Sequence, residues 1–406
     1  MVKLFGDTII TIVYLILGVL CGIITGLFPG IHPNNIAILS SLLIPYFGVN
    51  NYIPFLIGLV ITHYFMNFIP SAFLGVPDDE TAVSVLPMHR LTLSGNGYEG
   101  VILAGFGSYL GIIFSIIICL FLILLNFDVL SFYSSIKFFI PIMLILFIIY
   151  QILTSKSIWE ILVIFLSGIF GIAVLYCSPA YYITLNAIFT GMFGIPLLIN
   201  NLRLKKCNIK SQIITFPEFK LKYLKSSFFA STVGFFRIFL PGVSGAQINY
   251  ILSKILKEEK DLKNFIVSQG SIILANEAFS LLAITFIGIG RSGIARVIQQ
   301  IKPDVDINLL LFSILISSTM ALIILVILSK YVLIFIKKVS LKYLSLFFIV
   351  FCSLIIVVGS YNLYLFYHII VYITAICIGL ITFNSKSKPS YMMNVLIFPT
   401  VLYFLH

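Results

Sequence analysis

The polar residues that could do chemistry are few, and they lie inside long apolar runs. Asn276 and Glu277 lie near the middle of the run 264–288, and His63 lies 213 positions before Asn276, inside the run 52–75. An acidic side chain in a membrane span costs roughly 3 kcal/mol on insertion scales, which invites a functional explanation. We predict a proton or Na⁺ site at His63, Asn276 and Glu277. The alternatives are a buried glutamate satisfied by hydrogen bonds and a buried histidine with a backbone partner.

Helix breakers inside two other apolar runs indicate a second kind of chemistry, anion binding. A helix that begins inside a membrane directs unpaired N–H groups and a positive dipole end into the protein, and an anion there completes the hydrogen bonding. The alternative is a pair of kinks filled by neighbouring helices. The predicted substrate-binding residues are Pro29, Gly30, His32, Asn34 and Asn35 in the first half and Arg237, Pro241, Gly242, Ser244, Gly245 and Gln247 in the second.

Local signals show how helices restart after each break. Ser244 and Gln247 have the spacing of a capping box, and Pro33 suits a first helical position. Arg237, four residues before Pro241, is the side-chain cation best placed for a bound anion. The loops after 52–75 and 264–288 carry acidic residues and two arginines, Arg291 and Arg296, respectively. These loop charges are either entrance fields for ions or ordinary solvated side chains.

The composition defines the elements that must position these residues. The chain has 406 residues, of which 60% are hydrophobic and 10% charged, so it is predicted to be an all-α polytopic protein of the cell membrane. Runs such as 101–125 are apolar on every face, which excludes an outer-membrane barrel. The net charge of +11 lies in short loops, where it sets orientation and does not indicate nucleic acid. The six cysteines have no metal or disulfide spacing, and no cofactor is expected.

A basic segment divides the chain into two halves. Residues 201–225 carry seven Lys and Arg residues against Glu218, which predicts a cytoplasmic linker between a repeat at 1–200 and a repeat at 226–406. Residues 243–253 cannot cross a core about 30 Å thick, so we expect a re-entrant hairpin at Pro241. Each half is then one hairpin plus five spans, which makes the repeats inverted. The expected spans are 52–75, 100–126, 136–153, 158–177 and 180–199, then 264–288, 307–329, 343–361, 363–383 and 391–405.

Two sequence landmarks keep register between the halves. Pro29 and Gly30 match Pro241 and Gly242 at an offset of 212, and a break at Gly75 matches one at Gly288, 213 positions later. Chance coincidence of common membrane-helix residues is the alternative explanation.

These motifs resemble those of a known family. The first Pro-Gly pair, TAVSVLPMHRLTLSGNGYEG at 81–100, PGVSGAQ at 241–247 and LANEAF at 274–279 resemble landmarks of the large membrane subunit of tripartite tricarboxylate transporters, the TctA type, particularly its shorter archaeal-like relatives. The family pattern before Pro-Met is T-A-L-D-G-Y, whereas Ser84, Val85 and Leu86 precede Pro87 here. The second-half G-I-P-G element of the family reads GIGR at 288–291. The resemblance implies a periplasmic binding protein and a small membrane subunit as partners.

The sequence therefore predicts a secondary transporter that moves an organic anion, a carboxylate, with H⁺ or Na⁺. The alternative is a translocase of a polyprenyl-phosphate lipid carrier, because PGVSG also looks like a signature of such proteins. A membrane-embedded enzyme is third, but no nucleophile elbow or H-E-x-x-H pattern supports it, and no nucleotide-binding loop is visible.

Overall fold

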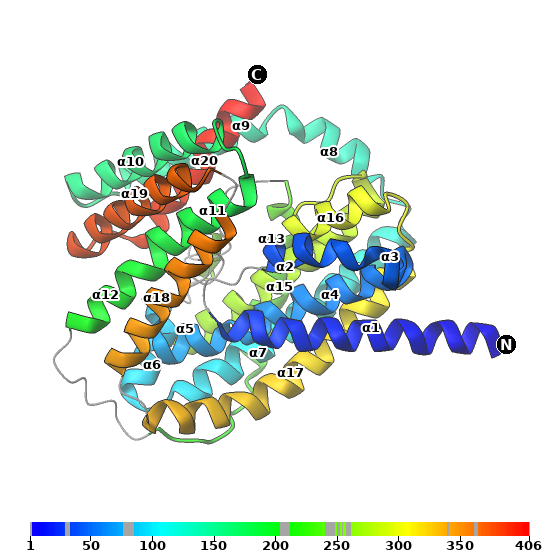
Figure 1. Ribbon diagram of the computed structural model, residues 1–406. Helices are drawn as coiled ribbons and strands as arrows, with labels where there is room; N and C mark the ends of the chain where they lie inside the picture. Colours follow the sequence, from blue (N-terminus) through cyan, green and yellow to red (C-terminus); the bar gives the residue numbers. More distant parts are fainter. Residues whose placement is uncertain are drawn as a thin grey trace.

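The computed structural model is helical and contains no strand in the part of the chain that it describes (Figure 1). It describes residues 2–28, 33–75, 85–203, 212–239, 248–249, 252–253, 255–256, 261–338, 341–360 and 364–405. The predicted fold class, an all-α polytopic membrane protein, is confirmed.

Long apolar helices account for most of the predicted spans. Eight segments of the described residues are long and apolar enough to cross a membrane. They lie in α1 (Val2–Leu27), α4 (Val49–Met66) with α5 (Phe68–Leu74), α7 (Gly97–Leu124), α10 (Ile158–Leu175), α11 (Tyr181–Phe189) with η2 (Thr190–Gly194) and α12 (Ile195–Arg203), α15 (Leu262–Ile287), α17 (Ile307–Lys338) and α19 (Leu365–Asn384).

Three of the ten expected spans differ from a simple crossing. The run 136–153 begins at the end of α8 (Val129–Lys137) and continues as α9 (Ile140–Leu153), and the two helices are bent by 59° relative to each other. Pro141, which lacks an N–H group, lies in the first turn of α9, where proline is well accommodated. The other two form shorter apolar helices, in α18 (Leu341–Ser360) and in η3 (Pro389–Met393) with α20 (Asn394–Leu405). Five full crossings in each half therefore remain a prediction.

The predicted glycine-marked breaks are confirmed. Helix α5 ends at Gly75 and α15 ends at Gly288, and both glycines adopt the left-handed conformation, with φ of 68° and 67°. A residue with a Cβ atom rarely adopts this conformation, whereas glycine adopts it readily and ends a helix there. Two positions related by an offset of 213 thus have the same backbone geometry.

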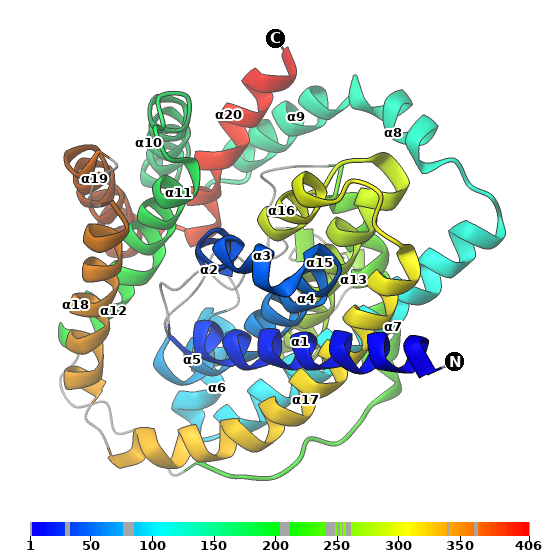
Figure 2. The same ribbon diagram turned by 45° about the vertical axis from the view of Figure 1, so that its right-hand side comes forward.

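The helices form two groups, which we call the core bundle and the side bundle. The core bundle contains α1, α2 (Pro33–Ser40), α3 (Ile44–Phe47), α4, α5, α6 (Val85–Ser94), α7, α13 (Leu221–Arg237), α15, α16 (Gly293–Ile301) and α17. The side bundle contains α9 to α12 and α18 to α20 and lies apart from the core bundle in Figure 2. Helix α8 contacts α15 of the core bundle and leads into α9 of the side bundle, and α2 contacts α11. Both halves of the sequence contribute to each bundle.

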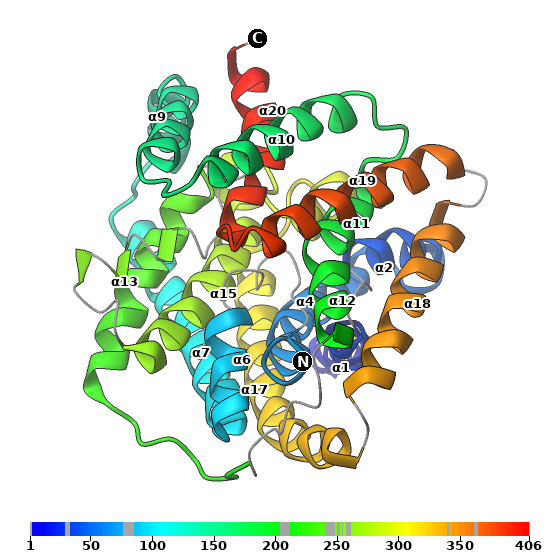
Figure 3. The ribbon, with the colours of Figure 1, turned by 90° about the vertical axis from the view of Figure 1, so that its left-hand side faces the viewer.

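Several contacts between helices have a counterpart in which each helix is replaced by the helix at the corresponding position of the other half. In the core bundle α1 contacts α4 as α13 contacts α15, and α7 contacts α15 as α17 contacts α4. In the side bundle, which faces the viewer in Figure 3, α10 contacts α20 as α19 contacts η2, and α9 contacts α20 as α18 contacts α12. This correspondence between the two halves supports the predicted repeat, whose inverted orientation stays a prediction.

Close approaches between helices show the same correspondence between the two halves. A Cβ atom on Gly22 of α1 would lie 3.1 Å from the His63 nitrogen, and one on Gly234 of α13 would lie 3.3 Å from the Asn276 nitrogen. Gly22 and Gly234 are 212 positions apart, as Pro29 and Pro241 are. The helix preceding each break therefore passes close to the matching residue of the next span.

Candidate functional site

The predicted ion-coupling residues lie on two central spans of the core bundle. The α4–α5 span is enclosed by protein along its length, and α15 is largely enclosed. Because the sequence of these spans is mostly apolar, the buried polar groups on them stand out. They are Thr62, His63, Asn67 and Ser71 on the first span and Asn264, Ser268, Gln269, Ser271, Glu277 and Ser280 on the second.

Glu277 is held by a serine from the turn that follows its own helix. Its side chain is 2% exposed, and Ser292 Oγ donates a hydrogen bond of 2.7 Å to Oε1. Ser292 also caps α16, since its Oγ accepts from the Ala295 nitrogen at 3.2 Å. The carboxyl group thus lies beside a helix N-terminus, where the dipole favours negative charge. Glu277 was predicted from the sequence, whereas Ser292 was not. A serine directly before an apolar helical pattern is the signal that could have indicated it.

In the first half, His63 occupies the position that corresponds to Asn276. His63 is 2% exposed, and its Nδ1 lies 3.1 Å from Thr25 Oγ1 on α1. Asn276 is half-buried beside the α13 helix. The three predicted residues are therefore divided between two spans, His63 on α4 and the other two on α15.

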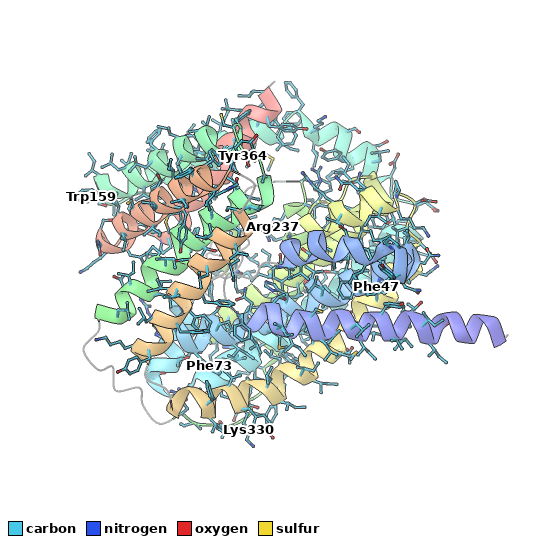
Figure 4. All side chains as sticks on the ribbon, viewed as in Figure 1. Phe47, Phe73, Trp159, Arg237, Lys330 and Tyr364 are labelled. Carbon is cyan, nitrogen blue, oxygen red and sulfur yellow. The ribbon has the colours of Figure 1, made fainter. Side chains whose placement is uncertain are left out.

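Arg237 lies in the last turn of α13, directly before the second break. Its side chain is half-buried, and it lies near the middle of the view in Figure 4. Arg237 is 212 positions after Thr25, the contact of His63. The repeat therefore relates Arg237 and Asn276 to Thr25 and His63.

Most of the predicted substrate-binding residues lie outside the described part of the chain. Pro29, Gly30, His32, Pro241, Gly242, Ser244, Gly245 and Gln247 belong to this group. Asn34 and Asn35 lie in the first turn of α2, but their side chains are not described. Helix α2 begins at Pro33, which confirms the predicted restart after the first break.

The segment after the first-half break is fixed to the end of α5. His89 Nδ1 lies 3.0 Å from the Ala72 carbonyl oxygen, and Thr92 Oγ1 donates to the same oxygen at 2.7 Å. Met88, next to Pro87, is buried. Burial lowers the pKa of His89 below its ordinary value, against the opposing effect of the hydrogen bond to Ala72. The contacts found here are structural, because they satisfy the carbonyl group of a helix end.

An apolar cavity lies between α1, α4 and the helices α2 and α3. Its volume is about 500 Å³, and two of its lining residues, Leu17 and Leu43, have exposed side chains. The Ser40 hydroxyl at its wall already bonds Tyr52 and the Ala37 carbonyl. An apolar chain suits this cavity better than an anion does. The full lining is Leu17, Cys21, Ile36, Ser40, Leu43, Phe47 and Phe55.

One half-buried charged side chain packs on an aromatic ring in a way that the sequence did not reveal. The guanidinium carbon of Arg291 lies 4.7 Å from the centre of the Tyr133 ring on α8. Its Nε and Nη2 atoms are buried, and neither has a hydrogen-bond partner in the described part of the chain. Arg296, five residues later in the sequence, is exposed. Sequence could not separate these two arginines, because Tyr133 lies more than a hundred residues away.

Comparison with known proteins identifies the family. Residues 12–394 match the Tripartite tricarboxylate transporter TctA family. The chain belongs to this family. It is also similar to the uncharacterized protein MJ1079 of Methanocaldococcus jannaschii, at 72% identity over 397 residues, 98% of this chain and 99% of that protein. No solved structure matches the chain. It is a membrane transporter protein of the TctA family, multi-pass in the cell membrane, as the sequence resemblance predicted.

Proposed function

We propose that this protein is a secondary transporter that moves an organic anion, a carboxylate, together with H⁺ or Na⁺. Membership of the TctA family supports the carboxylate. The observation that carries the ion coupling is Glu277, a 2%-exposed carboxyl group in an apolar span, bonded by Ser292. Such intramembrane acids belong to ion pathways by default, because burying them without a use is costly.

The anion rests against the backbone of the two helix breaks, with Arg237 as its cation. A helix break inside the membrane frees N–H groups at a depth where lipid offers no partner, and paired broken helices near the midplane are typical of transporter sites. The repeat correspondence supports this arrangement, since it relates the end of α1 beside His63 to the end of α13 beside Asn276. A bound anion and a cation at Glu277 then stabilise each other by their opposite charges.

Alternating access takes the form of movement between the two bundles. Within each bundle the helices approach closely at glycines, as at Gly171 and Gly379 in the side bundle, whose Cβ atoms would lie 2.0 Å and 2.2 Å from opposing carbonyl oxygens. Contact between the bundles is much less extensive and includes α2 against α11. Rigid bundles that share few contacts suit rocking of one against the other.

Accessory subunits complete the proposed system. The family is tripartite, so a small membrane subunit and a binding protein are the expected partners. They bind the transporter outside the two central spans, since protein of this chain already encloses most of those spans.

Translocation of a polyprenyl-phosphate lipid is a second candidate function, favoured by the apolar cavity. The apolar lining of the cavity suits an acyl or isoprenoid chain, and it includes residues of α1 and α2, the two helices that flank the first break in the sequence. A phosphate group at that break would find N–H donors. A lipid substrate predicts that transport requires the apolar chain, whereas a carboxylate substrate is transported without one.

Replacing Gly242 with leucine tests the ligand site. A side chain there blocks close approach to the backbone, so stabilisation by di- and tricarboxylates should fall strongly in thermal-shift measurements. Gly359→Leu is the matched control, because a Cβ atom at Gly359 meets nothing within 4 Å. Equal stabilisation of Gly242→Leu and the parent would show that the breaks are kinks and that the anion binds elsewhere.

A further inference from the structure

The Arg291 side chain occupies a position that packing alone does not explain. Its flat face lies on Tyr133, an arrangement that is favourable for a guanidinium group. The edge formed by Nε and Nη2 is nevertheless buried and has no hydrogen-bond partner among the described residues. Arginine does not lose its proton in proteins, so this edge is always a charged donor. A residue present only to cover Tyr133 would not need two buried N–H donors.

The two atoms lie on the same edge of the guanidinium group. An arginine edge with two parallel N–H groups matches both oxygens of one carboxylate, or two oxygens of one phosphate. From this geometry we infer that Arg291 and Tyr133 form an oxyanion-binding site, in which the Nε–Nη2 edge takes the anion and the tyrosine ring supports the cation. The inference rests on the proposed function for the source of the anion, a carboxylate of the transported substrate.

The backbone around Arg291 is fixed, which keeps this edge in place. Gln299 of α16 donates from Nε2 to the Gly288 carbonyl at 2.6 Å and accepts from the Gly290 nitrogen at 2.9 Å. The Arg291 nitrogen itself approaches the Ser280 carbonyl oxygen on α15 at 3.5 Å. A site built before its ligand arrives loses less conformational entropy on binding.

The site also contacts the residues that precede the predicted second break. The Tyr133 ring stacks on Phe239 at 5.9 Å, and Phe239 is two residues before Pro241. On the other side, Ser292 follows Arg291 directly and bonds Glu277. Arg291 therefore directly precedes the hydrogen-bond partner of the proposed ion-coupling residue, and its support Tyr133 packs on Phe239, which comes shortly before the predicted second break in the sequence. Arg291 is placed to bind a second oxyanion group of the same ligand.

Arg291→Lys is the decisive variant, because it keeps the positive charge and removes the paired N–H edge. Binding is followed by thermal shift of the purified parent and variant with succinate, citrate, inorganic phosphate and farnesyl phosphate. We expect the apparent Kd for the preferred probe to rise tenfold or more in Arg291→Lys. Arg296→Lys changes an exposed arginine of α16, five residues later in the sequence, and should match the parent. Preference for succinate or citrate identifies a carboxylate source, and preference for farnesyl phosphate identifies a lipid phosphate.

A second pair of variants covers the case in which Arg291→Lys does not fold. Tyr133→Leu leaves the arginine in place but removes its support, and should weaken binding several-fold, while Tyr133→Phe keeps the ring and should match the parent. Unchanged affinity in both Arg291→Lys and Tyr133→Leu overturns the site, as does a parent that binds none of the four probes. Transport is measured separately in liposomes. Transport that is the same in the parent and in Arg291→Lys overturns this inference alone. Binding that depends on Arg291, in a parent that does not transport the anion, overturns only the proposed function.

Discussion

The two central spans share close helix approaches but carry different polar side chains. Both are approached by a glycine of the preceding helix, Gly22 beside His63 and Gly234 beside Asn276, and both end at a left-handed glycine. The first span carries the pair of His63 and Thr25, whereas the second carries Glu277 bonded by Ser292. The backbone requirement is therefore shared by the repeats, while the acidic group that we assign to coupling belongs to the second alone.

The largest expected effect comes from the shared packing. Gly22→Ala places a Cβ atom 2.6 Å from the Leu59 carbonyl oxygen, and such overpacking costs about 1–3 kcal/mol or more. Gly359→Ala gains the same helix propensity, about 1 kcal/mol, with nothing within 4 Å. Thermal unfolding should show a large loss for Gly22→Ala, a smaller loss for Gly234→Ala and a slight gain for Gly359→Ala. Equal midpoints for all three would contradict the close helix approaches.

The difference in charge predicts the next effect. Glu277→Gln keeps the shape of the side chain and removes its titratable charge, so accumulation driven by an H⁺ or Na⁺ gradient should be abolished in a folded protein. Glu160→Gln is a matched control, because Glu160 is also buried, at 6% exposure, but lies in the side bundle, where it accepts from the Lys156 nitrogen. Gradient dependence that survives in Glu277→Gln would return this residue to a structural role.

Removing the partner of Glu277 should have a partial effect. Ser292→Ala eliminates a helix cap, at a cost of about 1 kcal/mol, and also the donor to the carboxyl group. Ser157→Ala removes the cap of α10 without touching the site. We expect both variants to lose similar stability, and only Ser292→Ala to shift the pH profile of transport. Identical profiles would show that Ser292 only caps the helix.

The smallest effect concerns pH and the segment after the first break. Because burial lowers the pKa of His89, the unfolded chain binds a proton more readily than the folded chain does. Stability should therefore fall as the pH drops below the ordinary value near 6.5, by about 1.4 kcal/mol for each unit of pKa difference. His89→Gln should flatten the dependence of the unfolding midpoint between pH 7 and pH 5. A parent whose midpoint rises over this range would contradict the prediction.

The sequence predicted the features that depend on local chemistry. Pro33 begins α2, and Gly75 and Gly288 end α5 and α15, because proline and glycine act through their own backbone dihedrals. The buried acid at 277 was equally visible, since its cost depends only on the apolar run around it. The bend before Pro141 was missed, although the same rule for proline applies there.

Features that depend on distant segments were not predictable. Arg291 is half-buried against Tyr133 of α8, and no local pattern distinguishes it from the exposed Arg296. Division into two bundles, each built from both halves, likewise depends on contacts between helices far apart in the chain. Hydrophobic periodicity identifies a helix and its depth, but not the helix against which it packs.

Uptake into liposomes that contain only this protein tests the central claim most directly. Labelled succinate or citrate is offered outside while an inward H⁺ or Na⁺ gradient is imposed, in liposomes with the parent and with Glu277→Gln. The account predicts that one of the two gradients drives accumulation of the anion above its external concentration in the parent, and that Glu277→Gln removes this accumulation. Gradient-driven accumulation that is the same in both proteins would contradict it.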